Sequence, residues 1–522
     1  MTENYLDILA DTIRNNWNQP ALTDFYLTED GKAQDTSRGN HYTYGEMYAE
    51  IVRISDLLTT LGLEKGDHIA ICGANSAHWV IAYLAIAKMQ GVSVTIMYSL
   101  PTDEIARLID FSDAKALFVD RELWTDIEEQ FIPQIQSVVA LEDWNVIYGE
   151  QICINEQLQF TNDQCQFVHG TLDELAMMCF TSGSTNIPKG VMLSYRGLSD
   201  SLALTIFKMD YWETLKNTRR PFLATMPMAH MFGLTDNVLC HLVYGKQVII
   251  YAEYLSIEHI LAVISICCSY GLAIIPSIFE KLIIYSQQNN CIQILRSLEY
   301  IVVAGAKVAS EVEKMAISIN LPYYVGYGLS EIVCVAASKF DSTKRGNSGK
   351  ILGSKEITLV NGEILVKGEN VMLGYYKDPE ATAAKIDAEG WLHTGDKGHL
   401  DEDGYLYVEG RLEQDIIVLP NGENICPDNI ESLVNALPEV SESIVLARDG
   451  RLVAIVVPKI RNQKSPYGVS RSEEITNADF RCKILHKINP LLPLYSQLDK
   501  VEISNVPLVR TSKQTLKRYL YK

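Results

Sequence analysis

The stretch Met177-Met-Cys-Phe-Thr-Ser-Gly-Ser-Thr-Asn-Ile-Pro-Lys-Gly-Val-Met192 leads from an apolar run into a loop of small polar residues. Small residues let backbone N–H groups and hydroxyls close around phosphate oxygens, and Lys189 adds a positive charge. The usual nucleotide loop places Gly-Lys before a Ser or Thr that opens a helix. This chain instead reads Lys189-Gly190-Val191, a poor match to a Walker-type NTPase. The stretch alone fits either a phosphate-binding loop or a plain surface loop.

Apolar runs of strand length alternate with helix-like stretches on both sides of this loop. The runs are residues 68–72, 93–96, 116–119, 223–226, 247–251, 272–275 and 300–303. Continuous Val, Ile and Leu runs separated by helices indicate an α/β fold with mainly parallel, buried strands.

After about Gly346 the pattern changes to short strands that lie close together in the sequence. The dipeptides Asn361-Gly362 and Asp403-Gly404 are hairpin signals between them. We therefore expect a large N-terminal domain over residues 1–411, with a small β-rich subdomain at about 346–411. A smaller α+β domain is expected over residues 412–522.

The composition is that of a soluble globular enzyme: 47% of the 522 residues are hydrophobic and 21% are charged. The net charge of −20 argues against a nucleic-acid partner. Residues 258–280 are long enough to span a bilayer, but Gly271 and Pro276 interrupt them, so a buried helix followed by a short strand is expected. With no secretory signal pattern and no zinc-like cysteine spacing, we expect a cytoplasmic protein without a transmembrane segment. The sequence does not exclude peripheral contact of the protein with a membrane surface.

The loop resembles the signature of the adenylate-forming superfamily, which includes acyl-CoA synthetases, firefly luciferase and peptide-synthetase adenylation domains. Asn186 replaces the glycine that the family usually has, and Asn is the non-glycine residue that best tolerates positive φ. The resemblance implies that the loop holds the β- and γ-phosphates of ATP, with Thr185 also contacting Mg²⁺ or phosphate. The residues that it assigns to ATP are Thr181, Ser182, Gly183, Ser184, Thr185 and Lys189.

Two further segments resemble motifs that line the acyl and adenine sites of this family. Pro227–Gly233 is similar to the acyl-pocket motif, which makes His230 and Phe232 a gate beside the substrate carboxylate and places Gly233 in the same pocket. Tyr300–Ala306 is an apolar run that ends in small residues, and it looks like the segment whose backbone lies against adenine. The adenine contacts implied there are Gly305 and Ala306.

The nucleotide motifs continue toward the C-terminus in the family's order. The segment Gly326-Tyr-Gly-Leu-Ser-Glu331 resembles the motif that stacks Tyr327 on adenine and makes Glu331 a Mg²⁺ ligand, which suits the preference of Mg²⁺ for oxygen. The Gly390–Asp396 motif implies that Asp396, on a tight turn, accepts both ribose hydroxyls. Arg411 would donate to the ribose or the phosphates. The other nucleotide contacts that these motifs imply are Gly326, Gly328 and Ser330.

The resemblance also implies the reaction. A carboxylate attacks the α-phosphorus of ATP to give an acyl-adenylate and pyrophosphate, and a thiol such as CoA then displaces AMP. Lys189 and Mg²⁺ on Glu331 would position groups and neutralise charge. The C-terminal domain would swing as a lid between the two half-reactions. Gly422 falls where the family's thiol-tunnel glycine lies, although a simple Asn-Gly turn explains it equally well.

The chain departs from the family at its C-terminus. Thr515 stands where the family has a lysine that contacts the reacting carboxylate and the α-phosphate. Lys513 and Lys517 would share a face with Thr515 in a strand, so either is a candidate substitute. Slow adenylation, or a C-terminal domain that serves mainly the thiol step, is the alternative.

The first functional hypothesis is a fatty acyl-CoA synthetase, because the Ala229–Gly233 segment and the Lys517–Tyr521 ending look most like long-chain fatty-acid ligases. A close alternative transfers the acyl group to carrier-protein phosphopantetheine, with the basic tail as the docking patch. A hypothesis of another class is a catalytically impaired acyl- or nucleotide-binding protein, motivated by Thr515.

Overall fold

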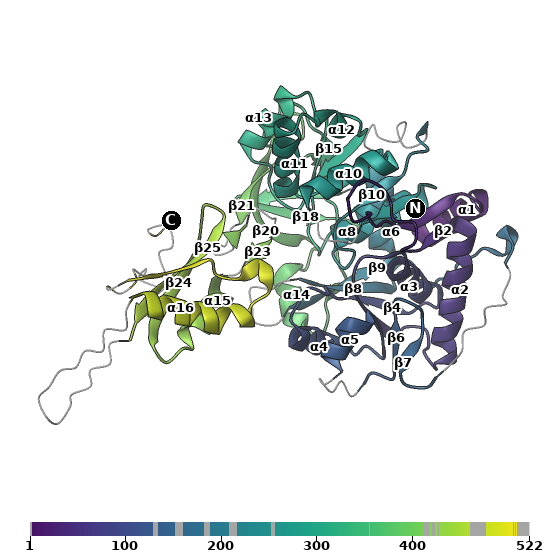
Figure 1. Ribbon diagram of the computed structural model, residues 1–522, viewed down its shortest axis with the longest axis horizontal. Coiled ribbons are helices and arrows are strands. Elements are labelled where there is room, and N and C mark those ends of the chain that lie inside the picture. Colours follow the sequence, from purple (N-terminus) through teal and green to yellow (C-terminus); the bar gives the residue numbers. More distant parts are fainter. Residues whose placement is uncertain are drawn as a thin grey trace, which may run out of the picture. The chain divides into compact units, whose positions relative to one another are not determined.

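The chain folds into two compact units in the computed structural model (Figure 1). The first comprises Met1–Tyr98, Thr102–Thr181 and Lys189–Leu412, and the second is mainly Glu413–Lys522. The structure describes residues 3–128, 134–151, 160–181, 188–207, 217–251, 256–353, 355–411, 417–419, 423–425, 427–459, 477–504, 506, 508 and 521.

A nine-stranded sheet forms one layer of the first unit. Its order is β16 (Lys350–Ile351), β15 (Ala336–Lys339), β14 (Tyr324–Tyr327), β13 (Tyr300–Val303), β12 (Gly271–Ile274), β10 (Phe222–Ala224), β11 (Val248–Ile250), β1 (Pro20–Asp24) and β2 (His41–Thr43). The six strands from β14 to β1 are parallel, and antiparallel strands close both edges.

An eight-stranded sheet forms the second layer. Its order is β19 (Gly374–Tyr375), β9 (Lys189–Ser194), β8 (Leu175–Thr181), β4 (Val92–Thr95), β3 (His68–Cys72), β5 (Ala116–Val119), β6 (Ser137–Ala140) and β7 (Val146–Tyr148). The strands from β8 to β6 are parallel. Strands β4, β5 and β6 are buried along their whole length, as the continuous apolar runs predict.

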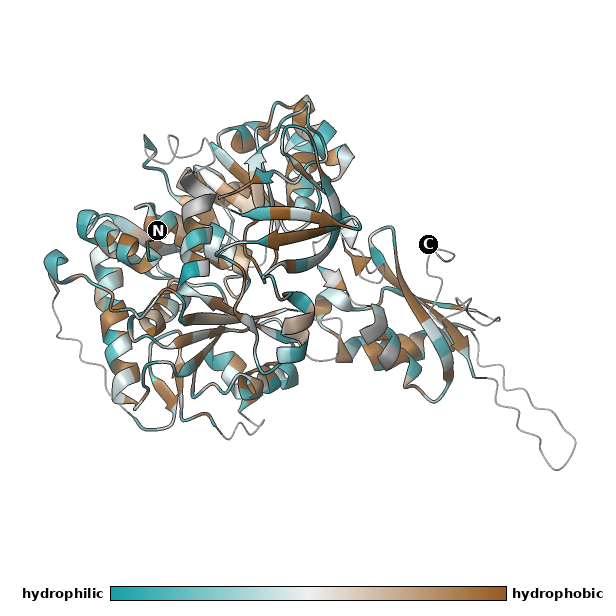
Figure 2. Ribbon diagram, turned by 180° about the vertical axis from the view of Figure 1, so that it is seen from behind, coloured by the Kyte–Doolittle hydropathy of each residue, from teal (hydrophilic) through white to brown (hydrophobic). Residues whose placement is uncertain are grey.

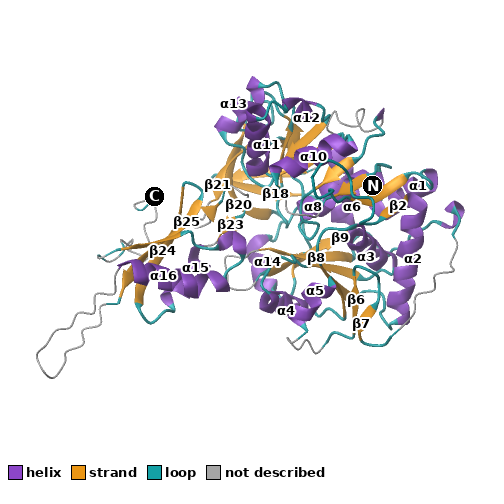
Figure 3. Ribbon diagram, in the orientation of Figure 1, coloured by secondary structure: helices purple, strands orange, loops and turns teal. Residues whose placement is uncertain are grey.

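Helices surround both sheets (Figure 3). They are α1 (Tyr5–Asn15), α2 (Tyr44–Thr60), α3 (Ala77–Lys88), α4 (Thr102–Phe111), α5 (Arg121–Ile127), α6 (Tyr195–Phe207), α8 (Met231–Leu234), α9 (Cys240–Val243), α10 (Ile257–Cys267), α11 (Pro276–Gln288), α12 (Ile292–Arg296), α13 (Ser310–Ser318) and α14 (Pro379–Lys385). The first residue of helix α3 follows Ser76, whose hydroxyl accepts from the Trp79 amide and so caps the helix. Almost every side chain of α3 is buried, which makes this helix the centre of the larger core.

The interrupted apolar stretch folds as a helix and a strand. Helix α10 ends at Cys267, because Cys268 adopts a left-handed conformation with φ of 50°. Strand β12 then begins at Gly271. None of the described helices combines the length and the apolar composition needed to cross a membrane. The hydropathy colours of Figure 2 show that hydrophobic and hydrophilic residues occur together along many of the helices and strands.

A four-stranded antiparallel sheet completes the first unit. Its order is β17 (Glu356–Val360), β18 (Glu363–Lys367), β20 (Leu392–Leu400) and β21 (Leu406–Arg411). Asn361 and Gly362 connect β17 to β18 with positive φ angles of 53° and 84°, as the predicted hairpin turn requires.

The second unit is a small α+β fold. It holds β22 (Ile417–Val418), β23 (Asn424–Ile425), α15 (Pro427–Asn435), β24 (Val440–Arg448), β25 (Arg451–Pro458), α16 (Asn477–Ile488) and β26 (Lys500–Ile503). Strands β24, β25 and β26 form one sheet over a separate hydrophobic core. The α/β class with a large N-terminal part and a small C-terminal part is therefore confirmed.

A buried ion pair connects helix α6 to the start of the four-stranded sheet. Lys355 Nζ lies 3.1 Å from Asp200 Oδ2, and the two side chains are only 1% and 12% exposed. Removing one partner of such a pair leaves the other charge buried and uncompensated.

We predict that Lys355→Met lowers the free energy of unfolding of the first unit by about 3 kcal/mol. Adding Asp200→Leu should restore most of the loss, because no charge then stays buried. Urea unfolding followed by tryptophan fluorescence reports on this unit, since every tryptophan precedes residue 412. Lys314→Met, which breaks an exposed pair with Glu311, is the control and should change stability by less than about 0.5 kcal/mol. An equal effect of both variants would contradict the prediction.

Candidate active site

The candidate site is built on the carboxyl ends of neighbouring parallel strands. Strand β13 ends at Val303 and leads into Ala304, Gly305 and Ala306, while its neighbour β14 ends at Tyr327. Strand β10 in the same sheet leads toward the segment with His230. Ligands of open α/β sheets bind in the crevice at this edge.

Side-chain hydrogen bonds connect the loops of the two large sheets at this edge. Thr95, at the end of β4, donates to the Ala229 carbonyl oxygen at 3.1 Å. Asn75, which follows β3, donates to the Met226 carbonyl at 2.8 Å and accepts from the Met228 amide at 2.9 Å. Residues of the eight-stranded sheet therefore hold the predicted acyl-pocket segment, which follows β10 of the nine-stranded sheet.

The predicted phosphate loop connects two antiparallel strands. Strand β8 ends at Thr181, and strand β9 begins opposite it at Lys189. A strand therefore begins at the lysine, where a Walker-type loop has a helix, in agreement with the poor match to a Walker-type NTPase. The loop residues Ser182, Gly183, Ser184 and Thr185 lie outside the described residues.

Lys189 and Glu331 approach opposite parts of one tyrosine, Tyr375. The Tyr375 hydroxyl donates to Glu331 Oε1 at 2.7 Å, and Lys189 Nζ lies 4.8 Å from the centre of the tyrosine ring. Strand β19 brings Tyr375 to this place by pairing with β9. Sequence reasoning did not identify Tyr375, because its role depends on a strand pairing between segments 184 residues apart.

The loop that carries Glu331 is fixed from several sides. The Glu331 carbonyl accepts from the Met372 amide at 2.8 Å. Buried Asn370 donates to the carbonyl oxygens of Ile332 and Cys334. A Cβ atom on Gly328 would lie 1.8 Å from the Val333 carbonyl oxygen, so the turn tolerates only glycine there. Gly326 and Ser330, both half-buried, flank this turn.

Asp396, the predicted ribose ligand, lies within strand β20, so the expectation that it occupies a tight turn was wrong. The register of its pairing with β21 shifts just after Asp396, between Lys397 and Gly398. The Tyr327 hydroxyl donates to Asp396 Oδ2 at 2.6 Å, which brings the predicted adenine and ribose residues together. Arg411 is the backbone partner of Asp396 in the β20–β21 register.

The predicted acyl-pocket residues sit at the start of a short helix. His230 precedes α8, and its Nδ1 accepts from the Phe232 amide at 3.3 Å. The imidazole keeps exposed surface, yet the protein around it removes enough water to lower the pKa of His230. A Cβ on Gly233 would lie 1.9 Å from the Pro227 carbonyl oxygen, so the turn between these residues needs glycine.

Asp236 follows Phe232 by one helical turn, in a π-helical segment over Thr235–Leu239. Burial raises the pKa of Asp236 to about 6, although the Thr235 hydroxyl donates a hydrogen bond at 2.9 Å that opposes the rise. The side chain nevertheless keeps some exposed surface. This carboxyl was missed in the sequence, where nothing distinguishes it from a surface aspartate.

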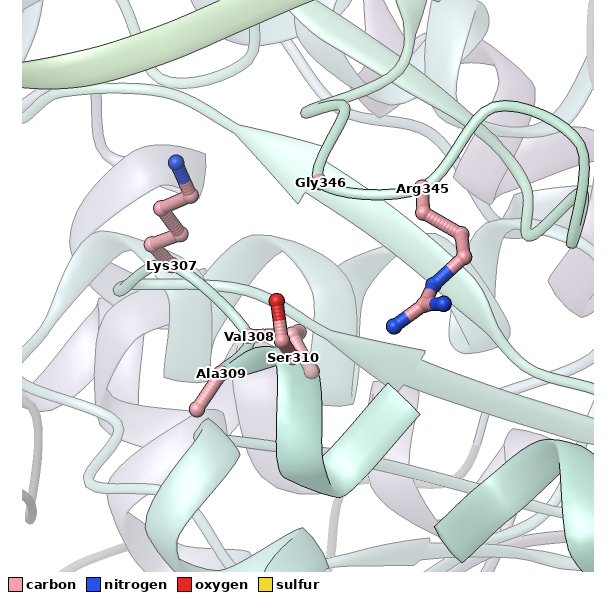
Figure 4. Close-up of a pocket in the computed structure, with 6 residues that line it drawn as sticks. All are labelled: Lys307, Val308, Ala309, Ser310, Arg345 and Gly346. Atoms are coloured by element: carbon pink, nitrogen blue, oxygen red, sulfur yellow. The ribbon is translucent and has the colours of Figure 1, made fainter. Parts of the chain in front are cut away.

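An open cleft of about 490 Å³ lies beside the predicted adenine segment (Figure 4). Lys307 and Arg345 line it, together with Ser310 at the start of α13. Arg345 also contacts Glu313 at 3.5 Å, so its charge is partly neutralised.

The residues present fit a magnesium ion. Glu331 offers a partly exposed carboxylate, and Tyr375 donates a hydrogen bond to one of its two oxygens. Mg²⁺ is commonly held by one or two carboxylates together with substrate phosphates. Within the described residues no three His, Cys, Asp or Glu side chains gather into a metal-binding group.

Three predicted residues of the C-terminal part lie outside the described residues. These predicted residues are Gly422, Lys513 and Lys517. Thr515, the residue at the position of the family's lysine, also lies outside the described residues. The geometry described above therefore concerns the first unit alone.

Comparison with known proteins identifies the family of the chain. The model of the AMP-binding enzyme family matches residues 10–376, and that of the AMP-binding enzyme C-terminal domain matches residues 414–521. A 4-coumarate–CoA ligase-like protein of Arabidopsis thaliana is 28% identical over 79% of this chain and 75% of its own length. A 2-succinylbenzoate–CoA ligase of Bacillus cereus is 27% identical over 81% of this chain and 83% of its own length.

Solved structures share the fold. An o-succinylbenzoate CoA synthetase variant from Bacillus subtilis, bound to a product analogue, superposes with a TM-score of 0.76 at 24% identity, covering 99% of this chain and 98% of that one. An amide bond synthetase from Marinactinospora thermotolerans gives a TM-score of 0.77 at 20% identity, covering 98% of each chain. With family models matched along both units, the chain belongs to the AMP-binding enzyme family of the adenylate-forming superfamily.

Proposed function

We propose that this chain is an AMP-forming acid–thiol ligase that activates a carboxylic acid with ATP and transfers the acyl group to CoA. The observation that carries the proposal is the placement of Lys189 and Asp396 by contacts with the segment Tyr327–Glu331. Tyr375 hydrogen-bonds Glu331 and contacts Lys189 through its ring, and Tyr327 hydrogen-bonds Asp396. Such a group provides a cation for phosphate, a carboxylate for a metal and an acceptor for ribose. The named CoA ligases among its relatives support the same reaction.

In the proposed reaction a carboxylate oxygen of the substrate attacks the α-phosphorus of ATP, an acyl–phosphate bond forms, and the bond to pyrophosphate breaks. Lys189 holds phosphate oxygens, Tyr327 stacks on adenine and Asp396 accepts from the ribose. Mg²⁺, when bound, supplies positive charge that offsets the phosphate charge. A thiolate then attacks the acyl carbon and AMP leaves, with the C-terminal unit closing as a lid between the half-reactions.

The first candidate substrate is a fatty acid, as the His230–Phe232 segment suggested. Asp236 favours a second candidate, an acid whose far end carries a hydroxyl or another hydrogen-bond donor. Burying a carboxyl against an alkyl chain is costly even with the Thr235 hydroxyl as a donor, whereas a substrate hydroxyl would add a second hydrogen bond. The 4-coumarate–CoA ligase-like relative, named for a phenolic acid, supports this second candidate.

The proposal also concerns the acceptor of the acyl group and whether the chain catalyses the reaction at a normal rate. CoA is the preferred acceptor, and carrier-protein phosphopantetheine is the alternative. A catalytically impaired binder is the remaining possibility, because Thr515 replaces the usual lysine.

We predict ATP–pyrophosphate exchange with at least one acid from a panel of short and long fatty acids, cinnamic and 4-hydroxycinnamic acids, and 2-succinylbenzoate. AMP release on adding CoA should accompany it. Exchange without CoA-dependent AMP release would indicate a carrier-protein acceptor, to be tested with a phosphopantetheinylated carrier. Nucleotide binding without exchange for any acid would reject the ligase and favour the binder.

We predict that Asp236→Leu changes the ratio of kcat/KM for 4-hydroxycinnamate and cinnamate by roughly tenfold in favour of cinnamate, because one hydrogen bond to the substrate is lost. The variant should also be more thermally stable than the wild type at pH 8. Since burial raises the pKa of Asp236 to about 6, its ionised form opposes folding above that pH, and the penalty disappears as pH falls toward 4. Thr235→Val, which removes only the hydroxyl beside the carboxyl, is the matched control and should leave the substrate ratio nearer the wild-type value. An unchanged ratio in Asp236→Leu would exclude the residue from acid recognition.

We predict that one of the single variants Lys513→Ala and Lys517→Ala slows pyrophosphate release by about 10²–10³-fold, as expected for loss of one positioned charge. The other variant serves as its control, and Thr515→Lys should raise the rate. If neither alanine variant is slower, no nearby lysine replaces the missing one.

A further inference from the structure

We propose that Tyr375 is a positioning residue that keeps Lys189 and Glu331 apart and orients both for metal-bound ATP. This inference rests on the proposed function and adds a residue to it. Tyr375 connects the two charged groups through two different parts of its side chain, the hydroxyl and the ring face.

The backbone around Tyr375 leaves its ring little freedom. The residue is only 5% exposed, and it pairs with Val191 in the two-residue strand β19. Its amide donates to the Thr382 hydroxyl at 2.8 Å, and that hydroxyl donates in turn to the Asp378 carbonyl at 2.8 Å. The ring is therefore held by a strand on one side and by the start of α14 on the other.

The chemistry of the two contacts explains why a tyrosine suits this place. Lys189 and Glu331 carry opposite charges, and a direct ion pair would withdraw both from ATP and the metal. The phenol donates to the carboxylate through its hydroxyl, while its ring face attracts the ammonium group. Both charges are then stabilised without neutralising each other.

The contacts of the two charged side chains agree with this role. Across the described ranges, no carboxylate forms an ion pair with Lys189, and Tyr375 is the one group that hydrogen-bonds the Glu331 carboxylate. The bond occupies Oε1 and leaves Oε2 available to a metal. A phenylalanine would keep the ring contact with Lys189 and lose the orientation of Glu331, so the two functions can be separated by substitution.

The test compares wild type, Tyr375→Phe and Tyr375→Leu by calorimetric ATP binding in Mg²⁺ and in EDTA. We expect Tyr375→Phe to weaken binding roughly tenfold in Mg²⁺ and to leave binding in EDTA unchanged, because it loses one hydrogen bond to a charged group. Tyr375→Leu should weaken binding in both conditions. The neighbouring variant Tyr376→Phe loses a hydroxyl that donates to Asp113 at 2.7 Å and should behave as the wild type.

The outcomes separate this inference from the proposed function. Equal binding of wild type and Tyr375→Phe in Mg²⁺ overturns the positioning role, as does an equal loss in Mg²⁺ and EDTA, which indicates a structural role. A wild type that binds ATP no better in Mg²⁺ than in EDTA overturns it as well. Failure of the wild type to exchange pyrophosphate with any acid rejects the ligase reaction, and the binding measurements remain interpretable without it.

Discussion

The parallel pairing of β13 with β14 is the constraint on which the candidate site depends. Parallel strands end at the same edge, so the register between Val303 and Val325 brings the residues that follow β13 to the end of β14, where Ala304 lies beside Gly326. The second sheet contributes its phosphate loop through the β8–β9 hairpin, and hydrogen bonds from Asn75 and Thr95 hold the loops of the two sheets together. Contacts of Tyr375 and Tyr327 then position Lys189, Glu331 and Asp396.

Much of this could be predicted from the sequence, because it depends on local patterns. The strand at Tyr300–Val303 has the predicted bounds, and the α/β class follows from the alternation of apolar runs with helices. The turn at Asn361-Gly362 was also predicted, since its residues favour positive φ. Family resemblance then supplied the candidate residues, whose roles remain predictions.

The remainder depends on contacts between distant segments. Asp396 was expected on a tight turn, but hydrogen bonding to β18 and β21 extends that segment into a strand. Tyr375 belongs to a strand of two residues, which carries no periodicity to detect. Asp236 is distinguished by its surroundings, which only the packed structure reveals. In each case tertiary contacts, and not local propensity, decide the conformation or the chemistry.

The hydrogen bond between Tyr327 and Asp396 has a consequence for the protein without nucleotide. Asp396 is 5% exposed, and a carboxylate so deeply enclosed would destabilise the empty protein if it had no donor. The phenol supplies that donor in advance. Under the proposed function, a ribose hydroxyl would replace the Tyr327 phenol as the donor to Asp396, so the carboxylate would remain hydrogen-bonded. Nucleotide binding would then change the donor to the carboxylate while the number of its hydrogen bonds stays nearly constant. The protein could therefore contain a buried ribose acceptor without losing stability before the nucleotide binds.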